Sequence, residues 1–295
     1  MKPPQRFTFS AADGTPLAGT LYEPEAVGQS GVLIAGGLGV AQRHYAHFAA
    51  WLAERGHVVM SFDLRGMGAS RQPEHRRSLR GLNADMLTWA GQDFAAAVAH
   101  LVAVTGGQAI TVIGHSLGLH HAGMTDAQTQ ARIAHAIGVA SGAGYWRDWA
   151  PPSRRLAPLM LHVAAPLLVP LFGYFPGKRL RMVADLPAPA MQQWSRWCRH
   201  PAFAWEAEPD RVGPSLEAAA FPITAFSFTD DEAMTERCTQ KLLAAFSHAP
   251  SRMVRMAPEE VGLKRIGHLG AFHPAGTEQL WMRFAAAIEN PHVVR

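Results

Sequence analysis

The sequence predicts an α/β fold with a mostly parallel central sheet, helices on both faces and an inserted helical segment. Short apolar runs alternate with amphipathic stretches along most of the chain. The runs are apolar throughout, and the alternation stops for about seventy residues before it resumes. Continuously apolar strands separated by helices are typical of a parallel sheet that is covered on both faces.

The individual elements follow from this alternation. Two extended segments flank Asp13-Gly14, a dipeptide that favours a hairpin turn, so an N-terminal antiparallel hairpin is expected. Further strands are expected over 31–37, 57–63, 109–116, 134–142, 222–231 and 251–258. Helices are expected over 44–56, 83–104, 119–131, 234–246 and 276–290.

Residues 145–215 are expected to form a helical cap without strands, inserted into a core of residues 1–144 and 216–295. The tryptophans of this segment, which should attach the cap to the core and roof an apolar pocket, are Trp146, Trp149, Trp194, Trp197 and Trp205. Residues 156–175 are about long enough to span a bilayer. Because three prolines and His162 interrupt them, a buried or interface-lying helix is expected and no transmembrane span.

Composition narrows the class of protein. Apolar residues make up 48% of the 295 residues and charged residues 17%, which excludes a disordered chain. The net charge is +4, but the arginines between positions 65 and 80 lack the pattern of a nucleic-acid reader, so no nucleic-acid partner is expected. Cys198 and Cys238 are too few for a disulfide framework, and the N-terminus has no apolar signal core. A cytoplasmic location is therefore expected.

The most informative stretch is "ITVIGHSLGL", where an apolar strand runs into Gly-His-Ser-Leu-Gly. Gly114 and Gly118 flank Ser116 because a strand that turns directly into a helix leaves no room for Cβ atoms. Ser116 is then held in a strained backbone conformation with its hydroxyl projecting outward. The helix N-terminus directs N–H groups at the same point, which suits a developing oxyanion. The stretch therefore predicts a nucleophile elbow.

Together with "DLRGMGAS" at 63–70, this stretch resembles the α/β-hydrolase superfamily, in its serine-nucleophile form with an inserted helical cap. The likeness covers nearly the whole chain apart from the cap. The segments "GYFPGKRL", "QWSRWCRHP", "SFTDDE" and "IGHLGAF" look like a poorly characterised bacterial branch of predicted hydrolases. The resemblance implies that Asp63 and Arg65 brace loops and that nucleophile, acid and histidine follow in that order.

The implied base is His268, which lies between Gly267 and Gly270 after the last strand. A serine hydroxyl is a poor nucleophile at neutral pH and needs such a base within hydrogen-bond reach. His273 is the alternative, but it precedes a proline at the approach to a helix.

The implied acid lies in "SFTDDEAM", after the next-to-last strand, where a carboxylate would fix the tautomer of the histidine. Asp231 is favoured over Asp230, and the residue without this role is expected to cap the following helix. Asp148 is the outside candidate, because some members carry the acid one strand earlier.

The oxyanion hole is expected to use the backbone N–H groups of Leu117 and Val40, with Leu38 as the alternative to Val40. The pattern of the superfamily has a histidine before the glycine of this loop, and this chain lacks that histidine. Leu119 is a second departure, because many relatives have glycine there. His115 is expected to have a packing role.

No metal ion or other cofactor is expected. The fifteen histidines include no His-Glu-x-x-His pattern, and "GGLG" at 36–39 lacks the third glycine of a nicotinamide-binding loop. These features favour a serine hydrolase that cleaves a carboxylic ester or thioester with an apolar acyl part through an acyl-enzyme. Two alternatives remain: an acyltransferase with an alcohol or amine acceptor, and a non-catalytic binding protein on a hydrolase fold.

Overall fold

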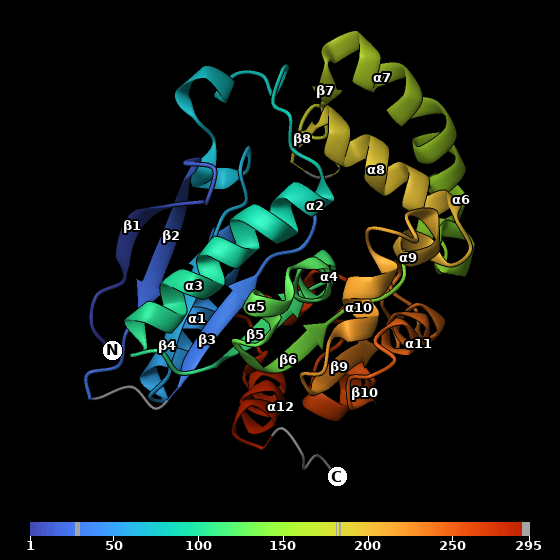
Figure 1. Cartoon of the computed structure of the whole chain (residues 1–295). Coiled ribbons are helices and arrows are strands. Elements are labelled where there is room, and N and C mark those ends of the chain that lie inside the picture. The colour runs from blue at the N-terminus through green and yellow to red at the C-terminus, as the bar shows by residue number, and fades with distance from the viewer. Residues whose placement is uncertain (27–29, 181, 183, 291–295) are drawn as a thin grey trace.

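The computed structural model describes residues 1–26, 30–180, 182 and 184–290 of the chain (Figure 1). Its centre is an eight-stranded sheet in the order β1-β2-β4-β3-β5-β6-β9-β10. The strands are β1 (Gln5–Ser10), β2 (Pro16–Tyr22), β3 (Gly31–Ala35), β4 (Val58–Phe62), β5 (Ile110–His115), β6 (Ile133–Val139), β9 (Ile223–Phe228) and β10 (Ser251–Met256). Strands β4, β3, β5, β6, β9 and β10 run parallel to one another, whereas β2 pairs antiparallel with both β1 and β4. The predicted fold class is confirmed.

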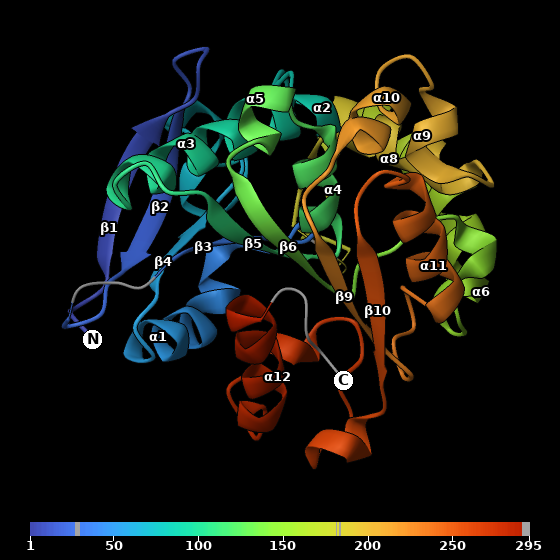
Figure 2. The ribbon, with the colours of Figure 1, turned by 60° about the horizontal axis from the view of Figure 1, so that its bottom comes forward.

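Helices cover both faces of the sheet (Figure 2). One face packs against α1 (Ala46–Glu54) and α12 (Glu278–Glu289). The elements on the other face are α2 (Met86–Thr88), α3 (Ala95–Val104), α4 (Leu117–Met124), α5 (Ala127–Gln130), α10 (Gly213–Ala218) and α11 (Glu236–Ala245). Neighbouring residues of β3 alternate between two apolar layers, so that Ile34 packs with α1 and Leu33 packs with α3.

Two of the expected helices are divided in the structure. The helix expected over 119–131 ends at Met124, and α5 begins at Ala127 because the carboxylate of Asp126 accepts the N–H of Thr129 and caps a new helix. The helix expected over 83–104 begins with α2, capped by Asp85, and continues through a π-helical stretch into α3.

The segment between β6 and β9 is mainly helical. It contains α6 (Ser153–Leu159), a π-helical stretch (Met160–Ala164), α7 (Ala165–Phe172), α8 (Ala188–Arg199) and α9 (Phe203–Ala207). The helices α7 and α8 pack side by side, beyond the sheet (Figure 1).

The expectation that this segment holds no strand is wrong. Two short strands, β7 (Tyr174–Phe175) and β8 (Leu186–Pro187), pair antiparallel. Gly173 ends α7 in the left-handed conformation, with φ 75°, and the chain leaves the helix extended. Asp185 then accepts the N–H of Lys178 at 3.2 Å, which ties the two arms together.

Candidate active site

Ser116 occupies the turn between β5 and α4, with φ 52° in the left-handed region that glycine favours. The glycines on either side permit this turn. A Cβ atom at Gly114 would lie 2.3 Å from the backbone nitrogen of Leu119, and one at Gly118 would lie 2.1 Å from the carbonyl oxygen of Ala35. The steric explanation for the glycines is therefore confirmed, and the turn is a strained one.

Leu119 departs from the pattern of the superfamily, and the structure shows how the fold accommodates it. The side chain is fully buried against β6 at Gly138. A Cβ atom at Gly138 would lie 2.7 Å from Leu119 Cδ2. The leucine therefore fills space that a missing side chain on β6 leaves open.

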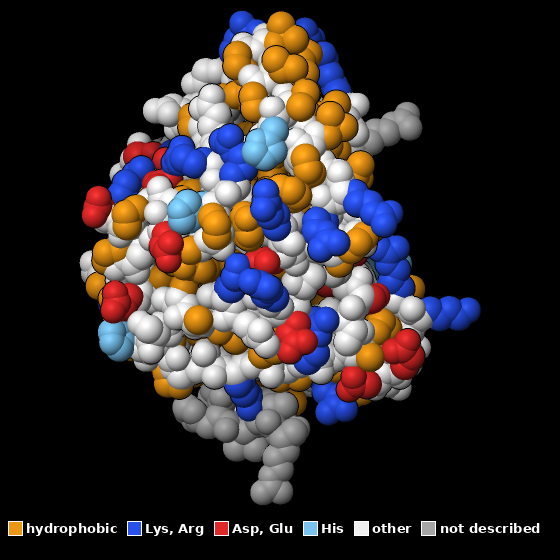
Figure 3. Space-filling model, turned by 90° about the vertical axis from the view of Figure 1, so that its right-hand side faces the viewer, with side chains coloured by type: hydrophobic (Ala, Val, Ile, Leu, Met, Phe, Trp, Pro, Cys, Tyr) orange, Lys and Arg blue, Asp and Glu red, His pale blue; other side chains and the backbone are white. Residues whose placement is uncertain are grey.

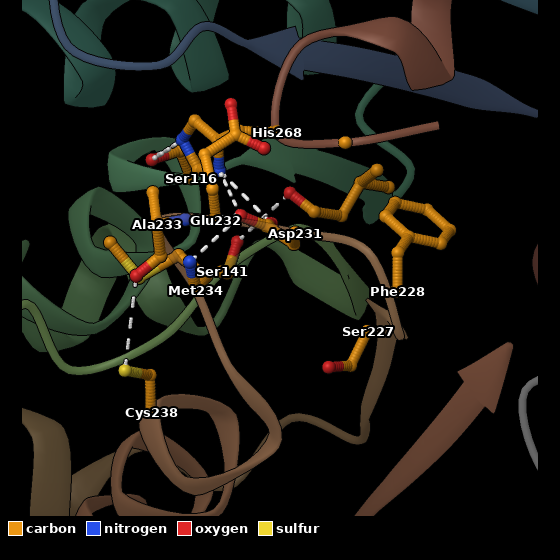
Figure 4. Close-up of polar contacts among 12 residues, drawn as sticks. Ser116, Ser141, Ser227, Phe228, Asp231, Glu232, Ala233, Met234, Cys238 and His268 are labelled. Carbon is orange, nitrogen blue, oxygen red and sulfur yellow. Dashed lines mark hydrogen bonds and ion pairs between the residues drawn. The ribbon is translucent and has the colours of Figure 1, made fainter. Parts of the chain in front are cut away.

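Three side chains from distant parts of the chain form a continuous hydrogen-bonded line (Figure 4). The hydroxyl of Ser116 lies 3.1 Å from Nε2 of His268. On the other side of the imidazole, Nδ1 lies 3.0 Å and 3.2 Å from the carboxylate oxygens of Asp231. Asp231 follows β9 and His268 follows β10, so the parallel sheet brings both to the edge where Ser116 projects.

The two neighbouring aspartates have different partners. The Asp231 carboxylate is buried and accepts the N–H groups of Ala233 and Met234, both at 2.8 Å. Asp230 instead accepts the N–H groups of Ile266 and Gly267, at 2.8 Å and 3.0 Å. Asp230 was expected to cap the next helix, and this is wrong, because it holds the loop that carries His268.

The outside candidates lie elsewhere. The Asp148 carboxylate pairs with Arg237 and Lys241, which makes it part of a charged cluster on α11. His273 is exposed, and its Nδ1 accepts the N–H of Ala275 at 3.3 Å. Both side chains therefore contact groups other than Ser116 and His268.

Burial and Asp231 act in opposite directions on the pKa of His268. Burial disfavours the imidazolium and lowers the pKa, but the hydrogen bond to Asp231 and the negative charge of Asp231 raise it. The net effect is a pKa above the ordinary histidine value of 6.5. The arrangement therefore stabilises the imidazolium that forms when this histidine accepts a proton.

His115 has a larger role than packing. The N–H of Gly37 donates to the hydroxyl of Tyr45 at 3.0 Å, and this hydroxyl donates to Nδ1 of His115 at 2.8 Å. At its other nitrogen, His115 donates to the carbonyl oxygen of His268 at 2.9 Å. Burial lowers the pKa of His115 to about 3, so the ring is neutral at ordinary pH. The chain of bonds links the loop after β3, the elbow and the loop of His268.

We expect Tyr45→Phe to lower the free energy of unfolding by about 1–3 kcal/mol, because Gly37 and His115 each lose a buried partner. Urea denaturation followed by tryptophan fluorescence measures this loss. Tyr145→Phe, at a more exposed tyrosine, is the matched control and should leave the unfolding curve unchanged. An unfolding curve of Tyr45→Phe that matches the wild type would contradict the linking role.

The loop after β3 passes beside the elbow, since a Cβ atom at Gly37 would lie 3.3 Å from Ser116 Cβ. The N–H of Val40 donates to the carbonyl oxygen of Gly37 at 3.0 Å and closes a turn. Among the described residues, the N–H groups of Leu38 and Leu117 have no such acceptor. The backbone N–H groups beside Ser116 that lack an acceptor therefore include those of Leu38 and Leu117.

A cavity of about 700 Å³ adjoins Ser116 and His268. Its walls are mainly apolar, and the large apolar residues among them include Leu38, Trp149, Met160, Phe175, Leu186, Met191, Trp194 and Phe203. Among the described residues that line it, Arg43 is the one member of the Lys, Arg, Asp and Glu group. Two of the five tryptophans of residues 145–215 thus line the cavity, and Trp197 instead lies buried and donates to Glu208.

The fold and the elbow define an α/β hydrolase, and comparison with protein families identifies the family within this class. The sequence profile of the family described as serine aminopeptidase, S33, matches residues 28–255. Because this match covers most of the chain, the protein belongs to that family. Comparison with curated protein sequences finds no match.

Solved structures of similar fold include an α/β hydrolase and two esterases. An α/β hydrolase, GrgF, from Penicillium sp. sh18 is 18% identical, with a TM-score of 0.63 and 98% of each chain covered. An esterase from Pyrococcus furiosus is 14% identical, with a TM-score of 0.60 over 98% of this chain and 92% of that chain. The esterase domain of a Rhodothermus marinus protein is 16% identical, with a TM-score of 0.60 over 97% and 98%. At these identities the likeness shows the fold.

Proposed function

We propose that the protein is a serine hydrolase that cleaves a carboxylic ester or thioester with an apolar acyl part. The observation that supports this most directly is the hydrogen-bonded line from buried Asp231 through His268 to Ser116, beside an apolar cavity. Ser116 Oγ attacks the carbonyl carbon while His268 Nε2 takes the hydroxyl proton. Asp231 holds Nδ1–H and stabilises the imidazolium.

Collapse of the tetrahedral intermediate breaks the bond to the leaving group, which takes the proton from His268 and departs. Water then enters, gives a proton to His268 and attacks the acyl-enzyme, and Ser116 regains its proton when the acid is released. The negative charge on the carbonyl oxygen needs two donors at each step. We assign these to the N–H groups of Leu117 and Leu38, in place of Val40, whose N–H closes a turn.

The charge of the cavity favours an ester or thioester over a peptide with a free amino terminus. An aminopeptidase must bind a protonated amine, which a carboxylate in the site would stabilise. Among the described residues that line the cavity there is no Asp or Glu, and Arg43 would repel the amine. We propose that residues 145–215 are the cap over this cavity and that an acyl chain lies against Trp149, Trp194 and Phe203.

A fluorophosphonate probe tests this proposal, because it reacts with an activated serine. We expect one covalent adduct on Ser116 in folded protein, located by peptide mass spectrometry. His268 accepts the serine proton only when neutral, so labelling should slow about tenfold per pH unit below the pKa of His268, which lies above 6.5. Thermally unfolded protein is the control. Folded protein without an adduct on Ser116 would support the binding-protein alternative and overturn the proposal.

A further inference from the structure

One long helix turns five of its apolar side chains toward solvent. It is made of α6, the π-helical stretch and α7, which together run from residue 153 to 172. The side facing the protein carries Ala157, Leu161, Ala165 and Val169. The side facing solvent carries Leu156, Leu159, Val163, Leu167 and Leu171, which are 45–67% exposed. A surface helix of a soluble domain normally presents a polar face to solvent, whereas this helix is mainly apolar on both sides.

Positive charge flanks this apolar face. Arg154 and Arg155 are exposed at the start of the helix, and Lys178 and Arg179 are exposed just after its end. Between Asp148 and Asp185 the sequence holds no Asp or Glu. Figure 3 shows the result, with hydrophobic side chains gathered over the upper part of this side of the molecule and Lys and Arg side chains on either side. The face therefore complements a surface that is apolar inside and negatively charged outside.

The helix that carries the apolar face also contributes to the wall of the cavity. Met160 lies in the same helix and lines the cavity. Met182 lines it too, yet is 52% exposed. A surface that covers the helix would therefore lie next to the cavity wall.

The attachment of the helix decides how it can meet such a surface. Among the described residues, two helices are long and apolar enough to cross a membrane by length and composition, 86–104 and 153–172. In the most apolar 18 residues of each, 44% and 22% are buried, respectively. In the second, Ser195 donates to the carbonyl oxygen of Leu161 at 3.3 Å, and Arg80 donates to those of Leu171 and Phe172. With one side packed on the protein, the helix can offer only the other side to lipid.

We propose that the apolar face of residues 156–171, with its flanking basic residues, docks the protein onto the surface of an anionic lipid membrane. An interfacial helix of this kind buries its apolar face at the level of the lipid head groups, and basic side chains beside it attract anionic lipids. The docking needs no hydrolysis, so it stands or falls separately from the catalytic proposal.

Vesicle flotation tests this proposal with the full chain. We expect the protein to float with phosphatidylcholine vesicles that contain 30% phosphatidylglycerol and to bind vesicles of phosphatidylcholine alone at least tenfold more weakly. Raising the salt concentration should weaken the binding to the anionic vesicles. Ser116→Ala should bind both kinds of vesicle as the wild type does, which separates docking from catalysis.

Two variants assign the binding to this face. Leu167→Ser with Leu171→Ser should lower vesicle binding at least tenfold, since both side chains would enter the interface. Arg154→Ser with Arg155→Ser should lower binding to the anionic vesicles by about fivefold for each charge removed. This factor corresponds to the ~1 kcal/mol by which one basic side chain is attracted to an anionic membrane surface. Met282→Ser on α12 and Arg132→Ser beside β6 are the matched exposed controls and should bind normally.

Three results would overturn the proposal: wild-type protein that binds no vesicle, face variants that bind as the wild type does, or loss of binding in the control variants as well. A second copy of the chain is the competing occupant of this face. Sedimentation would reveal it as a dimer that the double leucine variant abolishes, without any vesicle binding. Circular dichroism of each variant would show that the fold is retained.

Discussion

Replacing Ser116 with alanine is expected to lower kcat for a p-nitrophenyl acyl ester by about 10⁶-fold, close to complete loss. The expectation follows from the position of its hydroxyl, 3.1 Å from Nε2 of His268 and beside the free N–H of Leu117. Alanine keeps the backbone and leaves no nucleophile. The melting temperature should change little, because the hydroxyl projects into a cavity and takes no part in the core.

The measurement is steady-state hydrolysis with and without the substitution, on protein purified by the same steps. Ser78→Ala, at a serine of the loop before α2, is the matched control and should retain full activity. Residual turnover in Ser116→Ala within tenfold of the wild type would show that another group attacks the ester. The catalytic proposal would then be wrong.

Replacing Asp231 with asparagine should lower kcat by about 10⁴-fold. The asparagine oxygen can still accept the N–H groups of Ala233 and Met234, so the loop should keep its shape. Its amide group, however, carries no charge and can donate to Nδ1 of His268, which favours the wrong tautomer. The pKa of His268 should fall as well, because the charge that raises it is lost.

Asp230→Asn is the matched control, since the same substitution is made one residue earlier. Its side-chain oxygen can still accept the N–H groups of Ile266 and Gly267, so we expect a loss of no more than about tenfold. Activity and circular dichroism should be measured for both variants. A larger loss in Asp230→Asn than in Asp231→Asn would transfer the role of acid to Asp230.

Local patterns were sufficient to predict the sheet and the elbow. Apart from the edge strand β10, the strands that pair in parallel are mainly apolar runs, and such runs are stable between two layers of helices. The geometry around Ser116 depends on contacts within a few residues, together with β3, so the glycines of "GHSLG" were enough to predict it.

Other features depend on pairs that are far apart in the chain, which a local pattern does not reveal. The bond between His115 and the carbonyl of His268 joins residues 153 positions apart, and His44 donates to the carbonyl of Leu269 across 225 positions. Asp230 and Asp231 are adjacent, and their roles differ only because β10 delivers the loop of His268 beside them. The short β7–β8 pair likewise depends on a contact of Asp185 with the opposite arm.

The histidines around the cavity have a further consequence for experiments on ligands. Burial lowers the pKa of His44, that of His115 to about 3 and that of His120 to about 4, whereas the pKa of His268 is raised. Of these four imidazoles, His268 is thus the one whose pKa is raised, so it keeps its proton to a higher pH than the other three. Calorimetry of an inhibitor in buffers of different ionisation heat would therefore measure whether ligand binding changes the protonation of His268, with His268→Ala as the comparison.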